Sequence, residues 1–243
     1  MDYYDRYKNG QCIEVWSELT EMQTYSVEQQ KQIVNILQLM FDRVEYNLSA
    51  IVSLLPVFGY TFHDFGIPSY HEATPYEIVQ NSGTREVMEL NNLLKPYGKL
   101  PVVVQSFYRR IKSIDLRGSF TSWQEAPLLD ALYIEPVKHL ILLNNLSEGG
   151  LNQDEDNNYY MLFSLDEYMK EGVSGDAYAI YLDKEIKLDN YLLNYPLECT
   201  FVEYLRDCFK WGGLPGLANI QEKDIPSDIL TGIYSISERL LPI

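Results

Sequence analysis

A long run of regularly spaced apolar residues constrains the fold of this chain more than any other feature. The residues recur every three or four positions, as Ile33, Leu37, Met40, Val44, Leu48, Ile51 and Leu55. This spacing places them on one face of a helix. Ser26 and Gln29 form the capping box that begins a helix, and Pro56 ends or bends it. The pattern predicts one long amphipathic helix in the N-terminal part of the chain.

Shorter helices are predicted before and after it. Helical spacing of apolar residues covers 11–21, 85–95 and 227–240, and Pro101 suits the first turn of a helix that carries Phe107. Thr200 and Glu203 form a second capping box, and Gly212-Gly213 ends the helix that follows. The residues 59–62 are expected to form a turn and 66–84 an irregular surface segment.

The apolar period changes towards two in the middle of the chain. Alternation over 114–118, 132–135, 159–165 and 177–182 predicts strands of one antiparallel sheet. The segment 144–158 is expected to be an exposed, mobile loop. Helices, then strands, then helices indicate a single α+β domain over 1–243. Within it, a helical subdomain over 1–83 could precede a core over 84–243.

Composition favours a cytoplasmic protein. The chain has 243 residues, of which 46% are hydrophobic and 20 are Tyr, too many for a disordered chain. Acidic residues near Met1 take the place of the basic patch of a signal peptide, and the longest apolar stretch is too short to span a membrane. The cysteines Cys12, Cys199 and Cys208 are odd in number and widely spaced, which argues against a disulfide framework. Cys208 is expected to be buried.

The charge of the chain indicates what kind of partner it binds. Its formal net charge is -16, which repels nucleic acid and anionic membranes and attracts basic proteins. Arg109, Arg110 and Lys112 form the densest basic cluster, and we expect an ordinary solvated helix face there. We therefore expect a basic protein partner, no nucleic acid and no membrane.

Motifs of catalysis are missing from the sequence. It has no GxSxG elbow and no glycine-rich phosphate loop. His63, His71 and His139 lack metal-ligand spacing, although His63-Asp64 with His71-Glu72 could supply ligands, and 152–157 is only a faint likeness of a calcium loop. We expect no enzyme activity, no cofactor and no metal. The alternative is an enzyme of unrecognised type that uses Asp130, Glu135 and His139.

Several segments between residues 90 and 216 resemble the SUKH superfamily. Gly98-Lys99-Leu100-Pro101, Phe107-Tyr108 and Ser113-Ile114-Asp115-Leu116 resemble its core motif of a helix that opens with Leu-Pro and leads into a first strand. The segments 130–134, 159–163 and 176–180 resemble its later strands, and 200–205 its terminal helix. The chain departs from the pattern at Lys112-Ser113, where the family has glycine or asparagine-glycine. The N-terminal helical region has no counterpart in the minimal domain.

The resemblance implies an intracellular immunity protein that neutralises a toxin by stoichiometric binding. In such proteins an acidic face opposes a basic toxin, and a few aromatic residues anchor the contact. The candidate partner-binding residues are Tyr70, Asp154, Glu155, Asp156, Tyr159 and Tyr160. Because the family also includes regulatory scaffolds that have no toxin partner, a scaffold of the same fold is the second interpretation.

Overall fold

The computed structural model describes residues 2–62, 75–78, 83–146 and 151–243. The helices of these segments are α1 (Tyr3–Lys8), α2 (Cys12–Thr20), α3 (Val27–Leu54), α4 (Gly83–Leu94), α5 (Val102–Arg110), α6 (Val137–Leu143), α7 (Glu167–Lys170), α8 (Phe201–Lys210) and α9 (Ser227–Ser237), with 3₁₀ turns η1 (Leu55–Phe58), η3 (Pro215–Asn219) and η4 (Glu222–Asp224). The strands are β1 (Tyr60–Phe62), β2 (Tyr76–Ile78), β3 (Ile111–Asp115), β4 (Gly118–Phe120), β5 (Tyr133–Ile134), β6 (Tyr160–Leu165), β7 (Ala177–Tyr181) and β8 (Leu192–Leu193). Small antiparallel sheets flanked by helices make the fold class α+β, as the sequence predicts.

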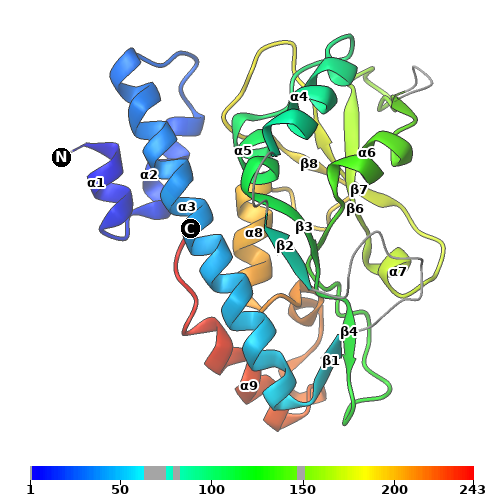
Figure 1. Cartoon of the computed structure of the whole chain (residues 1–243). Helices are drawn as coiled ribbons and strands as arrows, with labels where there is room; N and C mark the ends of the chain where they lie inside the picture. Colours follow the sequence, from blue (N-terminus) through cyan, green and yellow to red (C-terminus); the bar gives the residue numbers. More distant parts are fainter. Residues whose placement is uncertain (1, 63–74, 79–82, 147–150) are drawn as a thin grey trace.

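Helix α3 is the long helix that the apolar spacing predicts. Its capping box is formed, because Ser26 Oγ accepts from the Gln29 N–H at 3.3 Å and Gln29 Oε1 accepts from the Ser26 N–H at 2.9 Å. In Figure 1 it runs along one side of the molecule, with α1 and α2 beside its first half and α9 beside its second. Helix α3 ends at Leu54, and the 3₁₀ turn η1, which contains Pro56, follows it. Gly59 then takes a left-handed φ of 80°. The residues after Gly59 form strand β1, so the prediction of a simple turn there was wrong.

The predicted single sheet is divided into three. The strand orders are β1-β4, β2-β3-β5 and β6-β7-β8, all antiparallel. One backbone hydrogen bond, from Glu135 N to Phe163 O at 2.9 Å, joins β5 to β6. Pro136 follows directly and has no N–H to donate, which is a physical reason why the pairing does not continue. The predicted strand over 114–118 is also divided, into β3 and β4.

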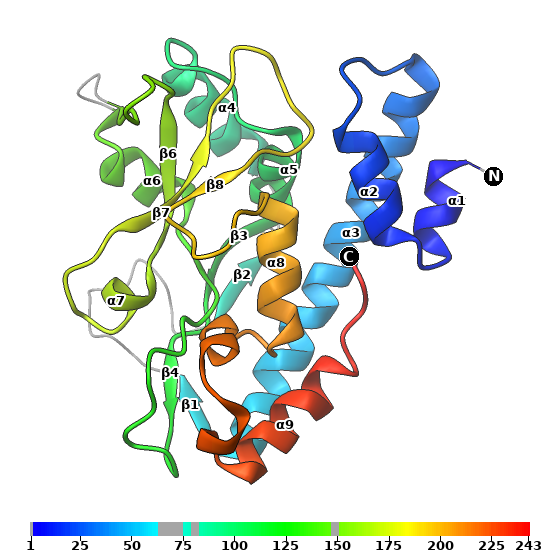
Figure 2. The same ribbon diagram turned by 180° about the vertical axis from the view of Figure 1, so that it is seen from behind.

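Helix α8 joins the sheets to the long helix. Its Phe201 packs edge-on against Phe107 of α5 and Phe163 of β6, with ring centroids 5.6 and 5.8 Å apart. The view from behind shows α8 between the strands and α3 (Figure 2). Cys208 is buried in its apolar face, as predicted. The helix ends at Lys210, and Gly213 takes a φ of 91° with its N–H bonded to Cys208 O.

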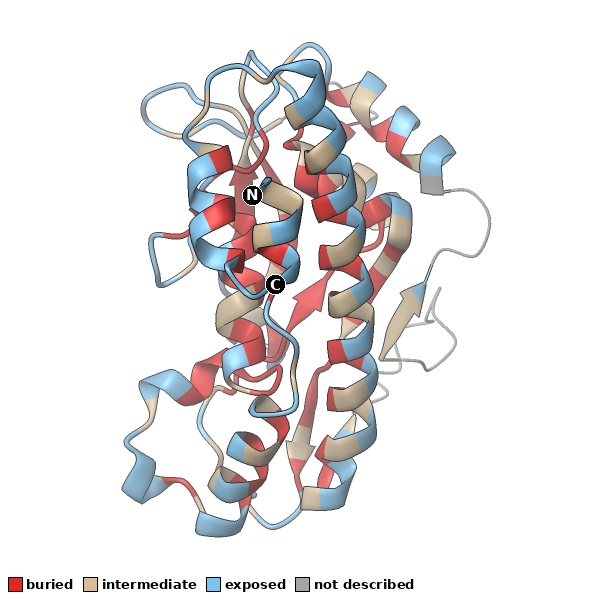
Figure 3. Cartoon of the chain, turned by 90° about the vertical axis from the view of Figure 1, so that its left-hand side faces the viewer, coloured by how far each residue is buried: buried red, intermediate tan, exposed pale blue. Residues whose placement is uncertain are grey.

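Most of the buried apolar residues of the described segments form one hydrophobic cluster. It includes Trp16 of α2, Met40 of α3, Phe163 of β6 and Ile233 of α9. Figure 3 shows buried residues along the inner faces of the helices and exposed residues on their outer faces. The division at residue 83 stays a prediction. None of the helices in the described segments combines the length and apolar character needed to cross a bilayer.

Part of the predicted solvated face is instead paired with acidic residues of neighbouring elements. Arg110 Nη2 lies 2.7 Å from Asp42 Oδ1 and 2.5 Å from Glu45 Oε1, which are both on α3. Lys112 Nζ lies 2.5 Å from Glu77 Oε2 of β2. Arg109 is exposed, as predicted, but the prediction was wrong for Arg110 and Lys112. Lys112 lies in β3 rather than in a helix, and spacing within one helix does not show which acidic residues a neighbouring element presents.

Candidate functional site

The acidic residues that the sequence singled out lie in a hydrogen-bonded turn. Asp154 Oδ1 accepts from the backbone N–H of Asp156 at 3.0 Å and of Asn158 at 2.8 Å. The Asn158 side-chain amide donates to the other Asp154 oxygen at 3.1 Å. These hydrogen bonds lower the pKa of Asp154, and the bond from the Asn158 side chain has the largest effect. Glu155 and Asp156 are exposed at the tip of the turn.

The described part of the segment 144–158 is exposed at 152–153 and 155–158, as predicted, but not at its start, and its mobility stays a prediction. Gln153 and Tyr159 form an antiparallel bridge across the base of the turn. Asn144 is buried and pairs with the backbone of Leu162, donating to its O at 2.9 Å and accepting from its N–H at 2.8 Å. An Asp side chain that bonds amides two and four residues ahead organises such a turn by itself. Asp154 therefore shapes the turn, whereas Glu155 and Asp156 present their carboxylates.

The predicted aromatic residues flank this turn. The Tyr159 ring packs edge-on against Tyr97 at 5.1 Å, and Tyr160 lies across the β6–β7 ladder from Tyr181 at 6.5 Å. The pKa of Tyr181 is raised, first by partial burial and next by the nearby Asp154 carboxylate. The structure thus brings five predicted residues together, and Tyr70 lies outside the described residues. Sequence reasoning missed Tyr181, which only the β6–β7 register places beside Tyr160.

An open pocket of about 440 Å³ lies next to the turn. Its lining residues are Asn158, Tyr181, Leu182, Asp183, Lys187, Asn190, Tyr191, Leu192 and Glu198. The Tyr191 side chain is 53% exposed. Lys187 Nζ lies 2.6 Å from Asp183 Oδ2, and the hydrogen bond between them lowers the pKa of Asp183. We call the turn, this pocket and the residues directly beside Asp183 (Lys99, Lys184 and Glu185) the acidic surface. Its carboxylates are Asp154, Glu155, Asp156, Asp183, Glu185 and Glu198, and its lysines are Lys99, Lys184 and Lys187.

The acidic surface can accept cationic side chains. Its carboxylates outnumber its lysines two to one. Exposed carboxylates beside half-exposed tyrosine rings attract lysine and arginine through charge, hydrogen bonds and the ring faces. Because Asp154 already orders the turn, binding of a cationic group there would cost little backbone conformational entropy.

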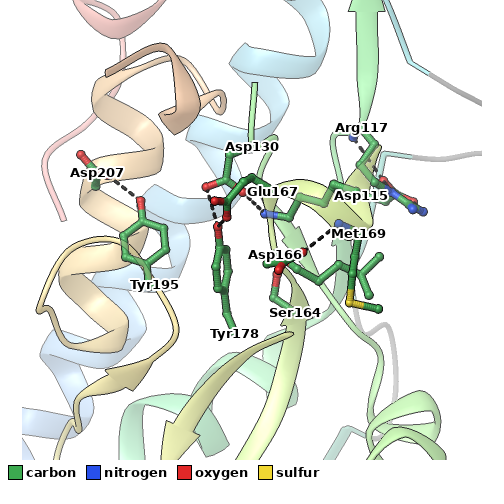
Figure 4. A network of polar contacts seen from close by, with 12 residues as sticks. Asp115, Arg117, Asp130, Ser164, Asp166, Glu167, Met169, Tyr178, Tyr195 and Asp207 are labelled. Atoms are coloured by element: carbon green, nitrogen blue, oxygen red, sulfur yellow. Dashed lines mark hydrogen bonds and ion pairs between the residues drawn. The ribbon is translucent and has the colours of Figure 1, made fainter. Parts of the chain in front are cut away.

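A second polar cluster is buried and was not foreseen (Figure 4). Lys170 of α7 forms an ion pair with Asp130, and their side chains are 1% and 6% exposed. The Tyr178 hydroxyl of β7 lies 3.0 Å from Asp130 Oδ2 and 2.7 Å from Glu167 Oε2. Asp130 has a left-handed φ of 48°, which is uncommon for a residue with a side chain. Asp130 lies 40 residues before Lys170 and 48 before Tyr178, so no local pattern signals these contacts.

The three residues of the enzyme alternative do not form one catalytic group. His139 Nδ1 lies 2.9 Å from Glu135 Oε2, one helical turn away. Asp130 instead bonds to Lys170 and Tyr178.

Two further expectations concern metals and cysteines. In the described segments no group of three or more His, Cys, Asp or Glu residues could hold a metal. His63, Asp64, His71 and Glu72 lie outside those segments. Cys12, Cys199 and Cys208 are free and buried, and burial raises the pKa of Cys199 to about 12. At neutral pH such a thiol is protonated and a weak nucleophile.

Comparisons with known proteins return no match. No family model, no curated protein and no solved structure is significantly similar to the chain.

Proposed function

We propose that this chain is a non-catalytic, cytoplasmic protein that binds a basic toxin in a stoichiometric complex and thereby neutralises it. The observation that carries the proposal is the acidic surface, where an ordered turn presents Glu155 and Asp156 beside Tyr160 and Tyr181. The net charge of -16 and the resemblance of 90–216 to the SUKH superfamily support the same function.

Physical chemistry gives the two kinds of residue different roles. Exposed carboxylates at the rim of an interface steer a basic partner towards it and raise the association rate. Aromatic rings at its centre supply affinity, because they bury area with few rotatable bonds. We assign the first role to Glu155, Asp156 and Glu198, and the second to Tyr160, Tyr181 and Tyr191.

The segments that carry the resemblance form a continuous part of the fold. Leu100-Pro101 precedes α5, Ser113 to Leu116 include the end of β3, and the later segments contribute to β5, β6, β7 and α8. Residue 101 caps α5 rather than lying in its first turn, with a ψ of 148°. In this proposal that part of the chain is the binding module, and α1 to α3 extend it.

The test is a binding measurement with matched variants. The partner is captured from the source-cell lysate on the tagged protein, identified, and purified for calorimetric titration. Glu155→Gln with Asp156→Asn removes two exposed charges but leaves Asp154 and its turn in place. We expect one-to-one binding that weakens about tenfold in this variant at low salt, and less at high salt.

The control is Glu28→Gln with Glu238→Gln, which removes two exposed charges on α3 and beyond the end of α9. It should bind as the unchanged protein does. Equal affinity of both variants at low salt would remove the turn from the interface. Failure to retain any basic protein at equal stoichiometry would contradict toxin neutralisation itself.

A further inference from the structure

The pocket beside the turn already holds a cation of the chain itself. Lys187 Nζ lies 2.6 Å from Asp183 Oδ2, and both residues line the pocket. The Lys187 side chain is 51% exposed and that of Asp183 is 35% exposed, so water reaches the pair. An ion pair as exposed as this one contributes little to stability and opens readily. Lys187 therefore shows where the pocket binds a positive charge, although the lysine is not fixed there.

Asp183 itself is held in place by its neighbours. Its backbone forms an antiparallel bridge with Lys99, whose N–H donates to Asp183 O at 2.8 Å. Its Oδ1 accepts from the Glu185 N–H at 3.3 Å. The chain at Gly98 packs so closely that a Cβ there would lie 2.8 Å from Leu182 Cβ. The carboxylate of Asp183 therefore stays at the pocket when the Lys187 side chain moves away.

The rest of the lining suits a flat, forked cation. Tyr181 and Tyr191 line the pocket side by side, since the Tyr181 N–H donates to Tyr191 O at 3.2 Å. Asn190 is 7% exposed and fixes both, because its Nδ2 donates to Tyr181 O at 2.9 Å and its Oδ1 accepts from the Tyr191 N–H at 3.1 Å. Glu198 adds a second, exposed carboxylate to the lining. A guanidinium donates two parallel hydrogen bonds to a carboxylate and stacks on aromatic rings, whereas a lysine ammonium is a compact point charge.

We infer that this pocket takes an arginine side chain of the partner, and that the guanidinium replaces Lys187 at Asp183. The inference rests on the proposed function and names the chemical group that the acidic surface recognises. The pocket volume of about 440 Å³ lies in the range of pockets that enclose small ligands. In the free protein Lys187 keeps Asp183 paired, so it competes with the incoming arginine.

This competition predicts that loss of a lysine strengthens binding. Lys187→Met keeps a flexible apolar chain but removes the charge, so Asp183 is free for the guanidinium. Binding of arginine should tighten about fivefold, the equivalent of one exposed ion pair. The control is Lys184→Met, which removes the same charge at an exposed residue outside the pocket lining. Salt at about 0.15 M screens the general effect of a lost charge, so the control should change the affinity less than about twofold.

The test uses a defined probe, the peptide acetyl-Gly-Arg-Gly-amide, and its counterpart with lysine in place of arginine. Each is titrated into the isotope-labelled protein, and the amide chemical shifts are followed by NMR. The arginine peptide should shift the amides of Tyr181, Asn190 and Tyr191 with a Kd of about 1 mM, and the lysine peptide should bind more weakly. Asp183→Asn, which keeps the shape of the side chain, should weaken the arginine peptide about tenfold.

Three results would each overturn the inference. They are the absence of these shifts in Lys187→Met, equal affinities of Lys187→Met and Lys184→Met, and a lysine peptide that binds as tightly as the arginine peptide. Both substituted side chains of the ion pair are partly exposed, so the variants should fold, and the dispersion of their amide spectra checks this. The peptide titration is independent of the captured partner, so failure of this inference can be distinguished from failure of the proposed function.

Discussion

At the scale of single residues, Asp189 has the largest predicted effect on stability. It is 6% exposed and accepts from the backbone N–H groups of Phe201 and Val202, both at 3.2 Å, and from Trp16 Nε1 at 3.1 Å. It thereby caps α8 and fixes α2 to it. We predict that Asp189→Ala lowers the free energy of unfolding by about 3 kcal/mol, because several buried donors lose a charged acceptor. Chemical denaturation measures the free energy of unfolding of both proteins. The control is Asp183→Ala, which breaks the more exposed ion pair with Lys187 and should cost less than about 1 kcal/mol.

At the scale of elements, the contact between α3 and α5 depends on the shape of one guanidinium group. Arg110 reaches both Asp42 and Glu45, and its Nε donates to Glu45 at 2.9 Å. Lysine cannot reproduce this forked geometry. We predict that Arg110→Lys costs about 1 kcal/mol of unfolding free energy, because the group is only partly buried. The control is Arg109→Lys, at the exposed neighbouring residue, and chemical denaturation measures both variants. An equal loss of unfolding free energy in the two variants would mean that the ion pairs of Arg110 with α3 contribute nothing.

The elements also show how far local sequence patterns can predict this fold. The long helix, its capping box and the end of α8 follow from chemistry within a few residues, and all three were predicted. The division of the sheet was not, because a two-residue strand such as β5 has too few positions to show a period. Glu155 and Asp156 were found as part of an acidic run, whereas Tyr181 and Lys170 acquire their roles from partners far along the chain. Such partners appear only once the strands are in register.

At the scale of the whole molecule, one hydrophobic cluster predicts cooperative unfolding. The C-terminal residues bind the N-terminal helices: Asn47 pairs with the Leu241 backbone at 2.9 and 2.7 Å, and Arg43 donates to Pro242 O at 2.8 Å. We predict a single calorimetric transition whose calorimetric and van't Hoff enthalpies agree. Two resolved transitions would instead support a separate helical subdomain over 1–83.

The central claim is that the acidic surface binds a basic protein, and titration calorimetry with the captured partner tests it most directly. The account predicts one-to-one binding whose affinity falls as salt increases, and which Glu155→Gln with Asp156→Asn weakens about tenfold at low salt. Binding that is indifferent to salt and to these two charges, or the absence of a stoichiometric complex, would contradict it.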